Sequence, residues 1–316
     1  MNLLKRNLAV LTLIGMAIVL PFNGQAQKTT GFKVLNNYKI ASPGGWDYIL
    51  VDGASKRVYV SHGSQVNVLS TTGDSVGYIP KTNGVHGIAV VHSLGKGYTS
   101  NGRSNSITVF DLKTLATTGE IQLTAKNPDA IFYDDFSKKI ITCNGGSHDL
   151  SIVDPVTEKT VAIVPLGEKL ETAVSDGKGK IFVNGEDNSV VHVVDAKTFK
   201  EITSYKIDGG NSPSGLDIDR ATNRLFIACG DSKTVVVMNA SNGKTVAKFP
   251  AGRTDGLVFD PQLKTIYVSN GEGNITAVRE ISADKFEFIE NITSEPGART
   301  IGIDLVTHHL YLPTAK

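Results

Sequence analysis

The chain has 316 residues, of which 40% are hydrophobic and 20% are charged, and its formal net charge is +1 at pH 7. This composition supplies enough apolar residues for a hydrophobic core and too little charge for intrinsic disorder. A near-neutral chain without long Lys/Arg clusters shows no sign of the basic surface that binds nucleic acid or anionic lipid, so we expect neither as a partner.

The first 26 residues have the pattern of an export signal. Lys5 and Arg6 precede an apolar run over residues 8–20, and Ala26 stands at a small-residue cleavage point in NGQAQ. The run is short for a membrane span, although an uncleaved anchor helix is the alternative. We therefore predict a signal peptide over residues 1–26 and a single exported domain over residues 27–316. After cleavage the protein would be periplasmic or extracellular, without membrane insertion.

The rest of the chain repeats with a period near forty residues. Each unit has a short apolar leading strand, an aromatic or β-branched strand, a Gly/Asn turn and an alternating apolar strand, usually followed by D-x-x-T and a fourth strand. Examples are YTSNGRSNSITVFDLKTLATTGEI, ITCNGGSHDLSIVDPVTEKTVAIV and FIACGDSKTVVVMNASNGKTVAKF. Four-stranded units at this period predict an all-β β-propeller, and seven leading strands predict seven blades.

One residue of each unit, two positions before the first apolar residue of the leading strand, fixes the repeat register. The seven register residues are Asp47, His86, Asp129, Glu171, Ser214, Asp255 and Arg299. The two cysteines, Cys143 and Cys229, fall in different units, so we expect buried free thiols and no disulfide.

The unit YVSNG…NITAV, with its degenerate copies, resembles the YVTN-repeat propellers, the YncE-like group of exported bacterial proteins. The resemblance covers the chain from about Phe32 to its end. It implies a seven-bladed propeller, but it implies no particular activity, because members of the group are recognised by their repeats and not by a catalytic motif.

The two ends of the repeat region predict an incomplete last blade. The segment FKVLNNYKI (Phe32–Ile40) matches FKEITSYKI (Phe199–Ile207), so we predict that it closes the ring as the outermost strand of that blade. The last unit, RTIGIDLVTHHLYLPTAK, supplies only two strands. We therefore expect a blade without its third strand, through truncation or incompleteness, and unpaired strand edges beside the gap.

The register residues are predicted to meet at one mouth of the central channel, because the innermost strand of every propeller blade borders that channel. A second polar set follows the second strands on the same face, and it includes His62, Asn101, Asn144 and Asn270, together with Asn184, Glu186 and Cys229. Taken singly, a residue such as Asp255 is better explained as a turn cap, and this holds more strongly for the three asparagines of Asn-Gly pairs. As a set, crowded carboxylates raise one another's pKa unless a cation or Arg299 compensates them, so we predict an acidic ligand-binding bowl.

Two imidazoles with flanking carboxylates form the predicted metal set. His62 and His86 come from adjacent blades, and Asp47 and Asp129 flank them, which is a donor set for a divalent transition metal. No other cofactor is indicated, and we assign no catalytic residue. We predict a monomeric binding or scaffold protein that takes a small molecule, a metal or a protein at this mouth. The alternatives are a metal-dependent lyase or hydrolase acting there, with Arg299 stabilising negative charge, and a protein-interaction module.

Overall fold

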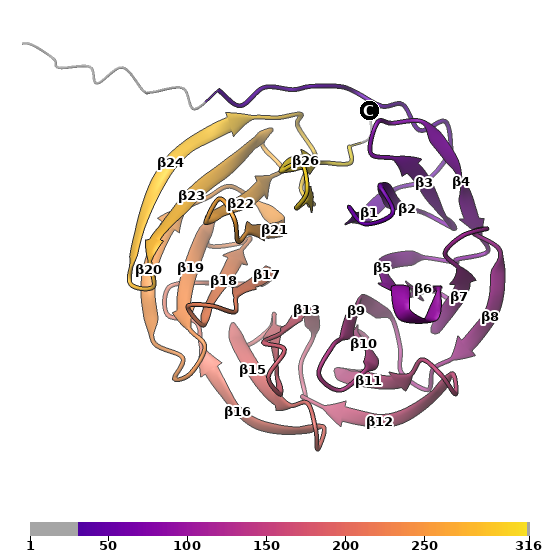
Figure 1. The fold of residues 1–316 in the computed structure, drawn as a ribbon. Coiled ribbons are helices and arrows are strands. Elements are labelled where there is room, and N and C mark those ends of the chain that lie inside the picture. Colours follow the sequence, from indigo (N-terminus) through magenta and orange to yellow (C-terminus); the bar gives the residue numbers. More distant parts are fainter. Residues whose placement is uncertain (1–30, 315–316) are drawn as a thin grey trace, which may run out of the picture.

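The structure is a computed structural model that describes residues 31–314, so the predicted signal peptide lies outside the described residues. Six four-stranded antiparallel sheets and one two-stranded sheet stand in a ring around a central channel (Figure 1). Within each sheet the strands follow chain order from the channel outward, as the repeat predicts. No helix of the described part is long and apolar enough to cross a membrane.

The strands of the first three sheets share lengths of six or seven residues. The first sheet contains β1 (Trp46–Asp52), β2 (Arg57–His62), β3 (Gln65–Ser70) and β4 (Ser75–Pro80). The second contains β5 (Val85–Val91), β6 (Lys96–Asn101), β7 (Ser106–Asp111) and β8 (Thr117–Gln122), with a short 3₁₀ helix, η1 (His92–Leu94), after β5. The third contains β9 (Pro128–Asp134), β10 (Lys139–Asn144), β11 (Asp149–Asp154) and β12 (Lys159–Pro165).

The same order continues through the second half of the ring. The fourth sheet contains β13 (Leu170–Ser175), β14 (Lys180–Gly185), β15 (Val190–Asp195) and β16 (Lys200–Lys206). The fifth contains β17 (Pro213–Asp219), β18 (Arg224–Cys229), β19 (Thr234–Asn239) and β20 (Thr245–Pro250). The sixth contains β21 (Thr254–Asp260), β22 (Thr265–Asn270), β23 (Asn274–Ser282) and β24 (Lys285–Thr293). The two-stranded sheet contains β25 (Gly302–Asp304) and β26 (His309–Tyr311).

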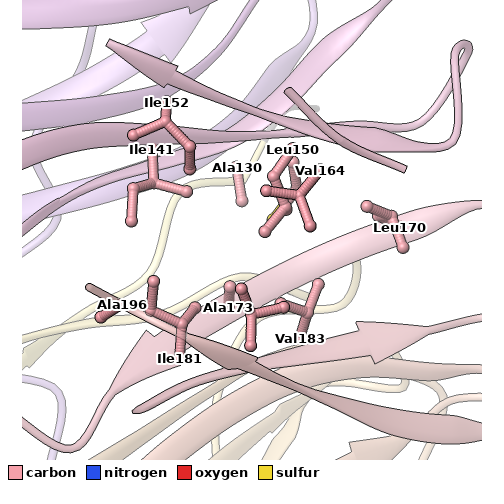
Figure 2. Close-up of a cluster of buried hydrophobic side chains, with 12 residues drawn as sticks. Ala130, Ile141, Leu150, Ile152, Val164, Leu170, Ala173, Ile181, Val183 and Ala196 are labelled. Atoms are coloured by element: carbon pink, nitrogen blue, oxygen red, sulfur yellow. The ribbon is translucent and has the colours of Figure 1, made fainter. Parts of the chain in front are cut away.

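The hydrophobic core lies between neighbouring sheets. Figure 2 shows Leu150 and Ile152 of β11 facing Ile181 and Val183 of β14, and all four side chains are fully buried. Alternate residues of a strand point to opposite faces, so the alternating apolar pattern of the repeat lets each sheet pack against both neighbours. The free thiols Cys143 and Cys229 are buried in separate clusters of this kind, as predicted.

The D-x-x-T sequences form the turns between third and fourth strands, as the repeat predicts. In three sheets the aspartate Oδ1 accepts the backbone N–H of the threonine three residues later, at 2.7–2.8 Å, and the pairs are Asp111 with Thr114, Asp154 with Thr157, and Asp195 with Thr198. These hydrogen bonds favour the ionised carboxylate and lower the pKa of Asp111 and Asp195. The pKa of Asp154 is lowered first by Lys139, whose Nζ donates to Asp154 Oδ2 at 2.9 Å, and then by the turn.

Side chains of the two-stranded sheet close the ring. The Thr300 hydroxyl, just before β25, donates to the carbonyl of Asp47 at 2.7 Å, and the Tyr311 hydroxyl of β26 donates to the carbonyl of Thr71 at 3.0 Å. Both acceptors belong to the first sheet or its β3–β4 turn, so the last unit of the chain docks on the first. The prediction that this unit supplies two strands is confirmed.

The prediction that Phe32–Ile40 forms a closing strand is wrong for the described structure, which assigns no strand to residues 31–45. The segment instead runs along the outer rim from the sixth sheet to the first (Figure 1). Phe32 packs edge-on against Tyr267 with ring centroids 5.9 Å apart, and Tyr38 lies beside Gly73. The physical reason is that β26 pairs only with β25 in the described residues, so the segment has no third strand with which to form a ladder.

Candidate functional site

The predicted mouth residues lie at the second position of the inner strands, each on an irregularity of the sheet. In all six four-stranded sheets the register between first and second strands shifts around this position. The residues concerned are Asp47, His86, Asp129, Glu171, Ser214 and Asp255. A β-bulge leaves one residue out of the ladder and redirects its side chain, which explains how a residue within a strand reaches the channel mouth.

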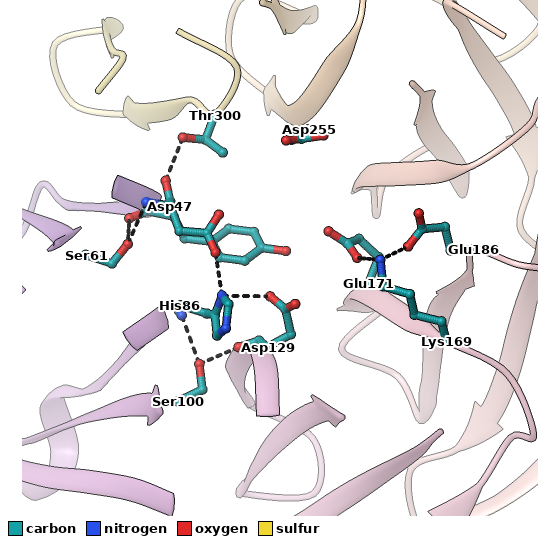
Figure 3. Close-up of polar contacts among 12 residues, drawn as sticks. Asp47, Ser61, His86, Ser100, Asp129, Lys169, Glu171, Glu186, Asp255 and Thr300 are labelled. Carbon is teal, nitrogen blue, oxygen red and sulfur yellow. Dashed lines mark hydrogen bonds and ion pairs between the residues drawn. The ribbon is translucent and has the colours of Figure 1, made fainter. Parts of the chain in front are cut away.

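Hydroxyl groups fix the backbone around these bulges. Ser100 Oγ accepts the N–H of Gly87 at 2.9 Å and donates to the carbonyl of Asp129 in the next sheet (Figure 3). Ser269 likewise donates to the carbonyl of Arg299. These positioning serines were not predicted, although each precedes an Asn-Gly pair of the repeat.

Three mouth residues from three successive sheets converge. His86 Nδ1 lies 2.5 Å from Asp47 Oδ2 and 3.7 Å from Asp129 Oδ1, and the three potential ligand atoms lie within 4.8 Å of one another (Figure 3). We call Asp47, His86 and Asp129 the triad. His62 does not join it, because its Nδ1 is held at 2.5 Å from the Ser42 hydroxyl.

The pKa values of His86, Asp129 and the nearby Glu171 are all raised. Burial lowers the pKa of His86, but the hydrogen bond to Asp47 and the charge of Asp129 outweigh it and raise that pKa to about 8. Burial raises the pKa of Asp129 to about 7, since the imidazole only partly offsets it. Burial and the charge of Asp129 together raise the pKa of Glu171 to about 8. These carboxyl groups therefore lack full compensation, and a bound cation would supply it.

Across the mouth, charged pairs surround a small polar cavity. Lys169 Nζ lies 3.6 Å from Glu171 Oε2 and pairs more closely with Glu186, while Arg299 Nη1 lies 2.9 Å from Asp255 Oδ2. The cavity has a volume of about 280 Å³, and all five of these residues line it together with Asp47. Asp255 thus contacts a guanidinium, and the turn-capping role considered for it is not seen among the described contacts.

The predicted asparagines lie in buried networks inside their own sheets. The Asn101 amide donates to Thr108 Oγ1 at 2.8 Å, and the Asn144 and Asn270 amides donate to Ser151 and Thr276 at 2.9 Å. All three asparagines are fully buried, so the structure places their amides away from the mouth surface. The following glycines are not in the left-handed region, but Asn270 Oδ1 accepts the backbone N–H of Gly252 at 2.8 Å, which is a contact of the turn-capping kind.

Two further predicted mouth residues have structural partners. Ser214 Oγ donates to the carbonyl of Thr254 at 2.8 Å, so its hydroxyl ties the fifth sheet to the sixth although the residue lines the polar cavity. The Asn184 amide donates to the carbonyl of Gly215 at 3.3 Å, which joins the fourth sheet to the fifth. Both residues therefore hold the ring together at this end.

A larger cavity of about 580 Å³ borders the inner strands β1, β5 and β9, and it is mainly apolar. Its walls include Leu50, Val90, Phe132 and Tyr133. It has no group of converging ligand atoms comparable to the triad within the described residues. The polar cavity, with the triad beside it, is therefore the candidate functional site.

Comparisons with known proteins establish the fold and leave the family open. No protein-family model matches the chain, and no curated protein matches its sequence. Among solved structures, a chain of Kuenenia stuttgartiensis hydrazine synthase is 14% identical with a TM-score of 0.71, and it covers 90% of this chain and 99% of its own.

Two further solved structures agree with the first. A chain of the mitotic checkpoint complex is 15% identical with a TM-score of 0.75, covering 98% of this chain and 96% of its own. The structure of U3-55K is 8% identical with a TM-score of 0.77, covering 87% and 90%. These neighbours are propeller proteins, so the chain has a propeller-like repeat fold.

Proposed function

We propose that the protein is a binding protein whose channel mouth holds a divalent transition metal between Asp47, His86 and Asp129. The observation that carries the proposal is the approach of three ligand atoms, from three separate sheets, to within 4.8 Å of one another. One imidazole nitrogen and two carboxylate oxygens suit ions such as Zn²⁺ or Mn²⁺.

Binding would exchange a proton for the metal. The 2.5 Å contact between His86 Nδ1 and Asp47 Oδ2 is a hydrogen bond. Two ligands of one tetrahedral Zn²⁺ stand about 3.4 Å apart, so the pair would open by about 1 Å as Nδ1 loses its proton. The raised pKa of His86, about 8, means that metal affinity should fall as the solution is made more acidic.

The wider assignment is part of the same proposal. We assign the two-stranded sheet as the seventh blade of a YVTN-type propeller, and residues 27–316 as its single domain. We also assign residues 1–26 as a signal peptide and the mature protein to the periplasm or the extracellular space. The repeat period, the resemblance of the YVSNG unit with its degenerate copies, and the charged-then-apolar leader support these assignments.

The test is the metal content of the mature protein, purified without chelator or affinity metal and measured by elemental mass spectrometry. The wild type should carry about one divalent ion per chain, and His86→Ala/Asp129→Asn should carry none. The matched control is Asp74→Asn/His309→Ala, which alters the same two residue types at exposed turn or edge positions and should keep the metal. A metal-free wild type that binds none of Mn²⁺, Zn²⁺ or Cu²⁺ on titration would refute the proposal.

Protein interaction is a second candidate function. Outer strands of the ring expose apolar side chains, with Val161 of β12 and Ile202 of β16 each about half exposed. One structural neighbour is a chain of the mitotic checkpoint complex, which is an assembly of proteins. A double change, Val161→Asp/Ile202→Asp, should abolish recovery of a specific partner by crosslinking if this surface is used, and should leave metal content unchanged.

A further inference from the structure

We infer that the metal-loaded mouth binds a small oxyanion that bridges the metal and Arg299. The inference rests on the proposed metal site and specifies the class of ligand that the site takes. The carboxylate of a small organic acid and an inorganic oxyanion share the required chemistry, which is a pair of adjacent negatively charged oxygens.

A metal bound by the triad would keep a free coordination position. The triad supplies three ligand atoms, and a metal held by three protein ligands keeps at least one position for water or another ligand. Asp47 belongs to the triad and also lines the polar cavity, so the cavity adjoins the metal position. A molecule in the cavity can therefore reach the open position.

The Arg299 guanidinium lies at the same cavity and has N–H groups left for a ligand. Arg299 lines the same cavity, and its neighbour Thr300 donates to the carbonyl of Asp47 at 2.7 Å. The Arg299 side chain is 49% exposed, and its ion pair with Asp255 uses Nη1. A guanidinium has five N–H donors in a planar fork that matches two oxyanion oxygens, so one edge can hold a ligand while the other holds Asp255.

The size and polarity of the cavity suit a small, charged ligand. A volume of about 280 Å³ is at the lower limit of small-molecule sites, so the cavity admits a compact ligand. Its walls are charged and hydroxyl-bearing, and they include Ser212 and Thr300. The Ser212 and Thr300 hydroxyls already donate to Glu186 and to the Asp47 carbonyl. The Arg299 guanidinium has N–H groups beyond the one paired with Asp255, and an oxyanion can accept hydrogen bonds from them, whereas an apolar ligand cannot.

Charge at the mouth sets the order of binding. Six carboxyl groups gather at the mouth, namely Asp47, Asp129, Glu171, Glu186, Asp231 and Asp255. Among the described residues, only three positively charged side chains line the cavity with them, namely Lys169, Arg253 and Arg299. In the metal-free mouth Lys169 and Arg299 already pair with carboxylates, and a bound divalent ion adds a positive centre with an open position for an anion. The oxyanion should bind after the metal.

The test is calorimetric titration of malonate, and separately of sulfate, into protein loaded with one Zn²⁺ and into metal-free protein. We expect binding of at least one probe to weaken at least tenfold without Zn²⁺. We expect a similar loss of probe affinity in Zn²⁺-loaded Arg299→Gln, because glutamine lacks the charged guanidinium and its paired N–H donors. Arg279→Gln, at an exposed position of β23, is the matched control and should bind as the wild type does.

The outcomes separate this inference from the metal proposal. If Zn²⁺ binds to the wild type and to Arg299→Gln with equal affinity, but neither probe binds, the inference is overturned and the metal site stands. The same conclusion follows if a probe binds equally well with and without Zn²⁺. If the wild type fails to bind Zn²⁺, the metal proposal fails, and the bridging ligand fails with it.

Discussion

Replacing Glu171 with glutamine should stabilise the metal-free protein at pH 8, and it should stabilise it much less at pH 5. Burial and the charge of Asp129 raise the pKa of Glu171 from 4.5 to about 8. The folded state therefore holds a proton that the unfolded state releases, and stability is lost as pH rises from 4.5 towards 8. This difference corresponds to a cost of about 4 kcal/mol at pH 8 and about 1 kcal/mol at pH 5. Glutamine has nearly the same shape as glutamate, but it has no carboxyl group that can ionise.

The assay is chemical unfolding in urea with EDTA present, at pH 5 and pH 8. We expect the gain of Glu171→Gln over wild type to be larger at pH 8 by up to about 3 kcal/mol. Glu120→Gln, at an exposed position of β8, is the control and should show no such pH dependence. Equal stability changes at the two pH values would refute the view that Glu171 is an incompletely compensated carboxyl group at the mouth.

Three further predictions concern packing around the site. A Cβ at Gly102 would lie 2.6 Å from the Nε2 of the triad imidazole, so Gly102→Ala should weaken Zn²⁺ binding at least tenfold by calorimetry. Gly145→Ala, which meets only ordinary contacts, should not. Ser100→Ala removes two hydrogen bonds at the mouth and should lower the free energy of unfolding, measured in urea, by about 2 kcal/mol. A decrease of less than about 0.5 kcal/mol would contradict the positioning role of Ser100. Burial raises the pKa of both Cys143 and Cys229, so neither thiol should react with a thiol reagent until denaturant is added; rapid native labelling would contradict their burial.

The repeat predicts most of the fold because each unit carries its own strand, turn and core signals. The alternating apolar residues of the third strands, such as Leu150 and Ile152, are the buried contacts between sheets. The aspartate turns follow from local hydrogen bonding and need no tertiary information. The failure at Phe32–Ile40 has the opposite cause. Its sequence is that of a strand, but strand formation depends on a partner ladder that local sequence does not reveal.

The candidate site was predictable in outline and not in detail. The register placed Asp47, His86 and Asp129 at one mouth, because a fixed period brings equivalent residues to equivalent places. The β-bulges that turn these side chains towards the channel left no signal in the sequence. Likewise, Asn101 and His62 stand at equivalent positions of adjacent units, and only the structure shows that one is buried in its own sheet and the other is held by Ser42.

The most direct test of the metal site is a crystal structure of the mature protein soaked in Mn²⁺ or Zn²⁺, with anomalous scattering data collected at the metal edge. The account predicts a single strong anomalous peak at the mouth, about 2.0–2.2 Å from His86 Nδ1 and from one oxygen each of Asp47 and Asp129. The peak should be absent from crystals of His86→Ala/Asp129→Asn. A strong peak elsewhere, with none at the triad, would contradict the assignment.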